Sequence, residues 1–214
     1  MRSPGRTIVI GDVHGCRDEA EDLLARCGHT ENDRVVFVGD LVAKGPDSAG
    51  VIDLCLRLGA RSVLGNHDAA ILRYFRAKAA GKARPVLKPA YGPVVDALQP
   101  HHVAYLEALP LWIALPEHDA LVVHAGVVPG VPLEEQDPLM LLNMRTVRPD
   151  GSGSTDAKEG ALWGTRWRGP ELVLLKGNFS GRIDLSMAAA GLGSLTKGKW
   201  SARGVSGGPL AGLH

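Results

Sequence analysis

Short apolar segments, each ending in a small polar cluster, recur from the start of this chain to residue 126. In order, the segments and their clusters are residues 7–10 with 11–15, 35–38 with 39–40, 62–64 with 65–68, and 121–123 with 124–126. Segments of this length, rich in valine and isoleucine, are typical of buried strands. Because ligands in open α/β sheets bind outside the carboxyl ends of strands, we expect the four clusters to meet in one crevice.

Helical patterns separate the first three strands. Apolar residues at helical spacing predict helices over residues 19–27, 48–58 and 68–78, and Asp47 or Ser48 suits the N-cap of the second helix. Strands that alternate with helices in this way favour βαβ units and a parallel sheet. The fold class is therefore α/β.

The middle of the chain predicts a second layer. Residues 79–93 suit an irregular cap, and short helices are expected over residues 94–98, 102–109 and 138–144. Residues 112–115 and 120–123 favour two strands around a turn at residues 117–119, which would begin the second sheet of a sandwich. Residues 148–160 suit a loop, and residues 171–175 a strand.

The character of the chain changes near residue 174. Of the 41 residues from there onward, nine are glycine and only Asp184 is acidic. We therefore predict a folded domain over residues 1–175 and a divergent Gly-rich tail over residues 176–214. Residues 185–214 are expected to be a loose tail rather than part of a sheet, which would leave the second sheet incomplete.

The polar clusters carry the side chains that divalent cations prefer. Carboxylate, imidazole and amide oxygen suit manganese, iron and zinc. A carboxylate at Asp40 can bridge two cations, which is the geometry of two-metal phosphate chemistry. The candidate donors are Asp12, His14, Asp40, Asn66, His67 and His124.

Charge and composition limit the kinds of partner and the compartment that we expect. The formal net charge of +1 gives no electrostatic reason to expect nucleic acid or an anionic membrane. No apolar run approaches the roughly 18 residues of a membrane span, and the first residues do not resemble a signal peptide. Three widely spaced cysteines indicate reduced thiols, so we expect a cytoplasmic protein.

These motifs, in this order, resemble those of the metallophosphoesterase superfamily. The signature parts Asp12-x-His14, Gly39-Asp40, Gly65-Asn66-His67-Asp68 and His124 are all present. The sequence around these motifs resembles the branch of the superfamily that contains phosphoprotein phosphatases and symmetrical diadenosine-tetraphosphate hydrolases. Residues 105–112, 122–126 and 141–145 look most like the ApaH-like phosphatases. The resemblance covers about residues 6 to 173 and implies a β-sandwich flanked by helices.

The resemblance also implies the roles of these residues. One divalent metal ion, of manganese, iron, zinc, cobalt or magnesium, would be held by Asp12, His14 and the bridging Asp40. The second would be held by Asp40, Asn66 and His124. His67 would be a general acid near the leaving group, and a metal-activated water would be the nucleophile. The substrate would be a small phosphate ester or a nucleotide, such as a dinucleoside polyphosphate.

Two departures from the family pattern concern the orientation of His67 and the binding of phosphate. Where phosphoprotein phosphatases have an aspartate that steadies the catalytic histidine, this chain has Ala43, so His67 needs another orienting group or none. The next motif position is Lys44 instead of arginine, and lysine lacks the bidentate fork of a guanidinium. We expect Lys44, Asn66 and Arg145 to contact phosphate. Ala43 and Lys44 count against a serine/threonine protein phosphatase, which stays an alternative.

A third departure concerns the second metal. The family pattern ends in a Gly-His after the strand at residues 171–175, but this chain has no histidine between His124 and His214. Asn178 is a weak substitute and His214 a poor one. A catalytically impaired relative without a complete second metal site is therefore a further alternative.

Other histidines and tryptophans lack a motif. His29, His101, His102 and His118 are interpreted as surface or cap residues. Trp163 and Trp167, beside Arg166 and Arg168, could stack on a nucleobase or anchor the second sheet, and the sequence leaves both open.

Overall fold

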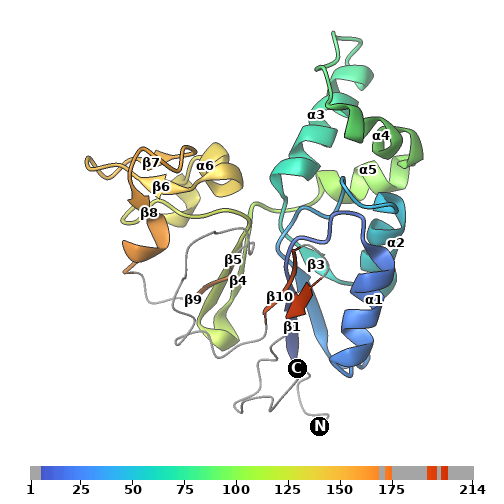
Figure 1. Ribbon diagram of the computed structural model, residues 1–214, viewed down its shortest axis with the longest axis horizontal. Coiled ribbons are helices and arrows are strands. Elements are labelled where there is room, and N and C mark those ends of the chain that lie inside the picture. The colour runs from blue at the N-terminus through green and yellow to red at the C-terminus, as the bar shows by residue number, and fades with distance from the viewer. Residues whose placement is uncertain (1–5, 169–171, 175–191, 197–198, 202–214) are drawn as a thin grey trace.

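Two β-sheets pack against each other, and helices share a hydrophobic core with the outer face of the first sheet (Figure 1). The computed structural model describes residues 6–168, 172–174, 192–196 and 199–201. The strand order of the first sheet is β11-β10-β1-β2-β3, and that of the second is β4-β5-β9. A small third sheet has the order β7-β6-β8. The α/β class and the helix-flanked sandwich are therefore confirmed.

The helices are α1 (Arg17–Arg26), α2 (Ser48–Leu58), α3 (Asn66–Ala79), α4 (Gly92–Ala97), α5 (Pro100–Glu107) and α6 (Pro138–Asn143). The strands are β1 (Thr7–Ile10), β2 (Arg34–Phe37), β3 (Arg61–Ser62), β4 (Trp112–Leu115), β5 (Ala120–Val123), β6 (Thr146–Val147), β7 (Gly153–Ser154), β8 (Ala161–Leu162), β9 (Leu172–Leu174), β10 (Leu192–Thr196) and β11 (Lys199–Ser201). Short 3₁₀ turns lie at η1 (Pro89–Tyr91), η2 (Pro116–His118), η3 (Leu133–Glu135) and η4 (Trp163–Thr165).

Strand alternation divides the core into layers. In β1, Ile8 and Ile10 pack with the helices, whereas Val9 packs toward the second sheet. Val122 of β5 meets Val9 in the layer between the sheets, and its neighbour Val123 faces the third sheet. Because successive side chains of a strand point to opposite faces, neighbouring residues of β1 and of β5 pack into different layers of the core.

Strands β1, β2 and β3 are mutually parallel, so their carboxyl ends lie at one edge of the first sheet. β4 and β5 form the predicted antiparallel pair, and β9 adds to β5 in parallel. The carboxyl end of β5 approaches that same edge from the second sheet. This arrangement places the four polar clusters together.

Local sequence explains the helix ends. The side chain of Asp47 accepts a hydrogen bond of 2.7 Å from the backbone N–H of Gly50, which confirms Asp47 as the N-cap of α2. Helix α3 begins at Asn66, two residues before the predicted start. Asn66 and His67 therefore lie in its first turn and not in a loop.

Two expectations about the later chain are wrong. The interval from residue 148 to 160 is not entirely loop, because β7 pairs with β6 there. Residues 185–214 are not uniformly a loose tail. β10 pairs in parallel with β1 of the first sheet, and β11 pairs antiparallel with β10. Backbone pairing to an open strand edge does not need the apolar pattern that the prediction relied on. The domain division at residue 175 stays a prediction.

The described residues contain no helix that combines the length and the hydropathy needed to cross a membrane. All three cysteines, Cys16, Cys27 and Cys55, are free thiols, as predicted.

Candidate metal centre

Four loops that leave strand ends meet above the sheet edge. The loops after β1 and β2 are tied together by backbone hydrogen bonds from His14 N–H to the Asp40 carbonyl and from Gly15 N–H to the Leu41 carbonyl, both 2.8 Å. Their backbone is unusual, since His14 and Asp40 have φ of 50° and 52°. Non-glycine residues in this region carry strain that persists only when the surroundings hold them. The two loops are therefore rigidly placed.

The close approach of the third loop depends on a glycine. A Cβ built on Gly65 would lie 2.0 Å from the backbone nitrogen of Asp40 and 2.3 Å from its Oδ1. Gly65 itself has ordinary extended dihedrals, so its constraint is space and not conformation. The missing side chain lets the start of α3 reach the Asp40 carboxylate.

The first group of possible metal ligands is Asp12, Asp40 and His124, whose ligand atoms lie within 4.8 Å of one another. His124 Nε2 is 3.4 Å from Asp40 Oδ1 and 2.8 Å from the side-chain oxygen of Asn66. All three residues of the group are buried, and the His124 ring is fully so. The His124 Nδ1 lies 2.8 Å from the Val38 carbonyl, an acceptor, and in the neutral ring this contact leaves the lone pair on Nε2.

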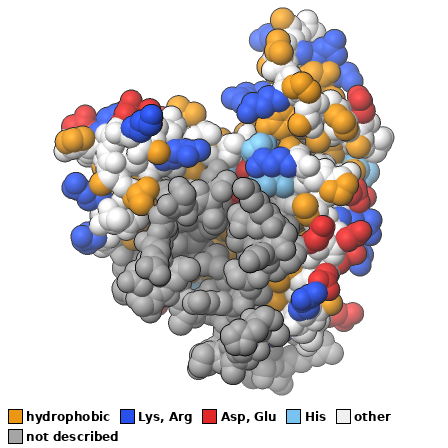
Figure 2. Space-filling view, in the orientation of Figure 1, with side chains coloured by type: hydrophobic (Ala, Val, Ile, Leu, Met, Phe, Trp, Pro, Cys, Tyr) orange, Lys and Arg blue, Asp and Glu red, His pale blue; other side chains and the backbone are white. Residues whose placement is uncertain are grey.

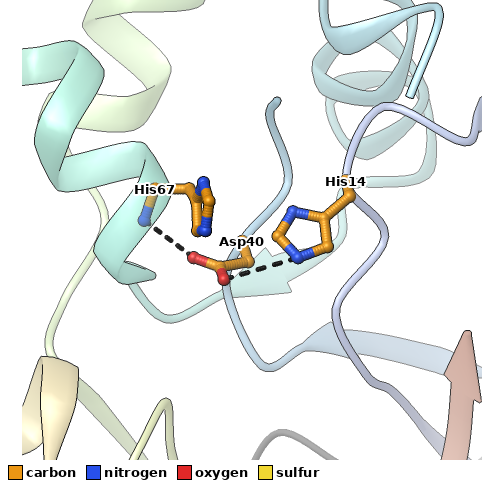
Figure 3. A group of neighbouring side chains, drawn as sticks. All are labelled: His14, Asp40 and His67. Carbon is orange, nitrogen blue, oxygen red and sulfur yellow. Dashed lines mark hydrogen bonds and ion pairs between the residues drawn. The ribbon is translucent and has the colours of Figure 1, made fainter. Parts of the chain in front are cut away.

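The second group is His14, Asp40 and His67 (Figure 3). His14 Nε2 is 3.6 Å from Asp40 Oδ2 and 3.7 Å from Asp12 Oδ2. The His14 Nδ1 lies 3.2 Å from the Val42 carbonyl, which directs the Nε2 lone pair toward these carboxylates. Asp40 belongs to both groups, with one oxygen facing each imidazole.

His67 stands at the rim of this cluster. Its backbone N–H donates to Asp40 Oδ1 at 2.9 Å, and its ring meets that of His14 edge to face at 4.9 Å (Figure 3). Its Nδ1 is 2.8 Å from the hydroxyl of Tyr91. Contacts with Asp40, His14 and Tyr91 therefore fix the position of His67.

Comparison with known proteins agrees with this geometry. The calcineurin-like phosphoesterase family profile matches residues 5–176. The chain belongs to the calcineurin-like phosphoesterase family.

Individual relatives are similar over part of their length. The symmetrical bis(5'-nucleosyl)-tetraphosphatase of Salmonella paratyphi C is 38% identical over 127 residues, which are 58% of this chain and 44% of that protein. The protein of the same name from Klebsiella pneumoniae is 39% identical over 132 residues, 60% of this chain and 45% of its own. The chain thus spans less than half of these curated relatives.

A solved structure, described as a candidate diadenosine tetraphosphatase, is similar with a TM-score of 0.70 and 37% identity. The similarity covers 81% of this chain and 75% of that one.

The calcineurin-like phosphoesterases imply divalent metals, and the residues present fit them. Two histidines have their Nδ1 held by backbone carbonyls and their Nε2 directed at the shared Asp40. The ammonium of Lys44 lies 2.6 Å from His14 Nε2, so this lone pair already faces a positive charge. Imidazole, carboxylate and amide oxygen together suit manganese, iron or zinc. The six predicted donors are brought together; their roles, and the number and identity of the metals, stay predictions.

Asp68 supports the cluster of candidate metal ligands through hydrogen bonds to the neighbouring loops, a role that the sequence did not predict. Its fully buried carboxylate accepts backbone N–H groups from Val42 at 3.1 Å and Gly65 at 2.9 Å. Burial, together with the negative charge of Asp40, raises the pKa of this carboxyl. Asp68 ties the second loop to the third, and its place in the Gly65–Asp68 cluster was the available signal.

The predicted phosphate ligands are unequally placed. Lys44 is exposed at the edge of the cluster through its contact with His14. Arg145 is exposed between α6 and β6, and its backbone N–H binds the Ser154 carbonyl. Its contact with phosphate stays a prediction. Asn178 and His214, the possible extra ligands of the second metal, lie outside the described residues.

Among the remaining histidines, His102 is not a surface residue, which was one of the two expected alternatives. It is 3% exposed, and its Nδ1 accepts the backbone N–H of Gln99 at 3.0 Å in a capping box at the start of α5. Its Nε2 lies 3.0 Å from Asp53. A histidine three residues after an N-cap position can cap like glutamine, which the absence of a motif concealed.

Trp163 anchors the second sheet. It is 2% exposed, and its indole N–H donates to the Ala125 carbonyl at 3.1 Å. A Cβ on Gly126 would collide with this indole at 2.4 Å. Stacking of Trp163 on a nucleobase is therefore excluded, and Trp167 packs partly buried against the same cluster.

Proposed function

We propose that this protein is a divalent-metal-dependent phosphoesterase that hydrolyses phosphoanhydride or phosphomonoester bonds. The observation that carries the proposal is Asp40, whose two carboxylate oxygens face His124 on one side and His14 on the other. A buried carboxylate shared by two imidazole-containing groups is suited to holding two cations a few ångströms apart.

Each ligand has a place in this scheme. Asp12, His14 and Asp40 would hold one cation, and Asp40, Asn66 and His124 the other. When bound, the cations would supply the charge that polarises a phosphoryl group and lowers the pKa of a water nucleophile. His67 holds a proton at Nε2 and passes it to the leaving oxygen. Lys44, beside His14, offers a point charge to a phosphate oxygen.

The surface beside the site favours extended anions. Residues 69–95 contain no acidic residue, and Figure 2 shows Lys and Arg side chains gathered over α3 and next to surface histidines. The cations of this segment are Arg73, Arg76, Lys78, Lys82, Arg84 and Lys88. Arg76 pairs with Glu107, and the other positive side chains of this segment would raise the local concentration of an anionic substrate. Together with the named relatives, this supports a dinucleoside polyphosphate or another nucleotide as substrate.

The alternative of a serine/threonine protein phosphatase finds no support. The position at which those enzymes carry an aspartate is the buried Ala43, which offers His67 no carboxylate. Phosphopeptide turnover exceeding that of diadenosine tetraphosphate would reverse this preference.

The deciding experiment is hydrolysis of p-nitrophenyl phosphate and diadenosine tetraphosphate with manganese, measured beside metal content per chain. Turnover with about two metals per chain is expected. No turnover with one metal or none would mean that the second site is incomplete without the family's final histidine. The chain would then be a catalytically impaired relative.

A further inference from the structure

Tyr91 reaches the candidate site from a segment that carries none of the metal-ligand motifs. It ends η1, between α3 and α4, and is 8% exposed within the helix-side core. Its hydroxyl lies 2.8 Å from Nδ1 of His67, with the two rings 5.7 Å apart and tilted by 59°. This is a close hydrogen bond between groups 24 residues apart.

The location of the hydroxyl is set by packing. Pro89 begins the 3₁₀ turn, and the Tyr91 N–H donates to the Lys88 carbonyl at 2.9 Å. The ring is then buried with Val94 and Leu98 in the helix-side core. A buried aromatic ring has few rotamers, so its oxygen is held at one point.

The bond meets a chemical need of His67. An imidazole that gives up a proton from Nε2 keeps the other on Nδ1, and an acceptor at Nδ1 fixes the ring plane during the transfer. The Tyr91 oxygen can accept that N–H. Burial, and then the negative charge of Asp40, raise the pKa of Tyr91, so the phenol stays neutral. A neutral acceptor orients the ring without adding charge beside the metal ligands.

We infer that Tyr91 is a positioning residue for His67, taking the place of the carboxylate that Ala43 cannot provide. The inference rests on the proposed function. Tyr91 touches neither substrate nor reacting atoms; it acts by aiming Nε2 of His67 at the leaving oxygen.

The test compares leaving groups. In Tyr91→Phe, which keeps the ring and removes the hydroxyl, kcat for phenyl phosphate should fall about tenfold or more, with KM nearly unchanged. The kcat for p-nitrophenyl phosphate should fall less than about threefold, because nitrophenolate departs with little help from an acid. Tyr105→Phe is the matched control, since the half-buried hydroxyl of Tyr105, in α5, donates to the carbonyl of Ala60, which carries no candidate metal ligand.

Two further variants test whether Tyr91 acts through His67. In a His67→Asn background, adding Tyr91→Phe should change kcat no further, because the group it positions is gone. An equal loss with both leaving groups, an additive double variant, or the same loss in Tyr105→Phe would each overturn the inference.

A second readout does not depend on activity. In the metal-free protein, long-range ¹H–¹⁵N NMR should show the Nδ1 signal of His67 moving in Tyr91→Phe while the signals of His118 stay in place. An unmoved His67 signal overturns the inference. If the wild type lacks turnover but this signal moves, the proposed function fails while the positioning bond is supported.

Discussion

At the scale of single residues, Asp40 is constrained at once by its backbone conformation, its burial and the partners of its carboxylate. Its backbone is left-handed, the residue is 1% exposed, and its two oxygens have partners in α3 and in the loop after β1. Alanine would add backbone strain to the loss of charge, whereas asparagine tolerates this conformation and keeps one oxygen for the His67 N–H. Asparagine is therefore the clean substitution.

Asp40→Asn should lower metal-dependent hydrolysis by more than about a hundredfold, beyond the loss typical of residues that only support ligands. The measurement is kcat with p-nitrophenyl phosphate and manganese. Asp96→Asn, an exposed carboxylate on α4, should retain full activity. Undiminished turnover in Asp40→Asn would refute the site.

The residues that sequence reasoning found and missed differ in kind. Asp12, His14 and His124 follow predicted strands directly, so chain order alone brings them together. Tyr91 arrives from a segment expected to be an irregular cap, and its partner is 24 residues away. Only the packing of η1 against α3 makes that contact, and no periodic pattern records it.

At the scale of elements, the start of α3 depends on the space at Gly65. Gly65→Ala should lower kcat about a hundredfold, because a displacement of about 1 Å at a catalytic group costs that much. It should also cost about 1–3 kcal/mol of unfolding free energy through overpacking. Activity and urea denaturation measure the two effects. Gly164→Ala, with nothing within 4 Å of the added Cβ, should change neither, and a normal Gly65→Ala enzyme would contradict the packing argument.

A second contact ties the start of β1 to the loop before β2. The Asp33 carboxylate accepts hydrogen bonds from the Arg6 guanidinium at 2.8 Å and from the Arg6 backbone N–H at 3.0 Å. The backbone N–H of Thr30 also donates to it, at 2.9 Å. The Arg6 side chain, more than the backbone donors, holds the pKa of Asp33 well below its usual range. A depressed carboxyl pKa stabilises the fold above the unfolded value of about 3.9 and ceases to do so as the pH falls through the folded value.

Asp33→Asn should therefore lose about 1–2 kcal/mol at pH 7, a figure reduced for the partial exposure of Arg6. The difference from wild type should shrink steadily below about pH 4. Denaturation at pH 7, 5 and 3 measures it. Asp22→Asn, which breaks an exposed pair with Arg26, should differ from wild type by less than about 0.5 kcal/mol throughout. A gap that widens in acid would reverse the sign of the argument.

Elements were predictable where their own sequence specifies them. The α2 helix has an N-cap, an apolar face and a terminal Gly59 at φ 58°, and its predicted bounds are those observed. Strands β7, β10 and β11 were missed because they form by pairing with a neighbour. Their stability depends on a partner strand, which local composition does not reveal.

At the scale of the whole molecule, the candidate ligands come from both sheets: Asp12 and Asp40 follow strands of the first, and His124 follows β5 of the second. A bound cation would therefore link the two layers. Manganese at about 100 times its dissociation constant should add about 2.7 kcal/mol, which is about 5–10 °C in melting temperature.

Differential scanning fluorimetry with manganese and then EDTA measures this shift. Asp40→Asn should abolish it, whereas Asp96→Asn should keep it. An equal shift in all three proteins would place the cation elsewhere.

The pairing of β10 with β1 has a consequence for how the protein is made. Val9 lies opposite Leu192, so β1 leaves the ribosome long before its partner β10 has been made. Until then β1 has a neighbour only on the side of β2, and its other edge can pair with any passing strand. Synthesis at about 5–20 residues per second leaves this edge open for many seconds. The nascent chain, more than the finished protein, is where this fold is vulnerable to aggregation.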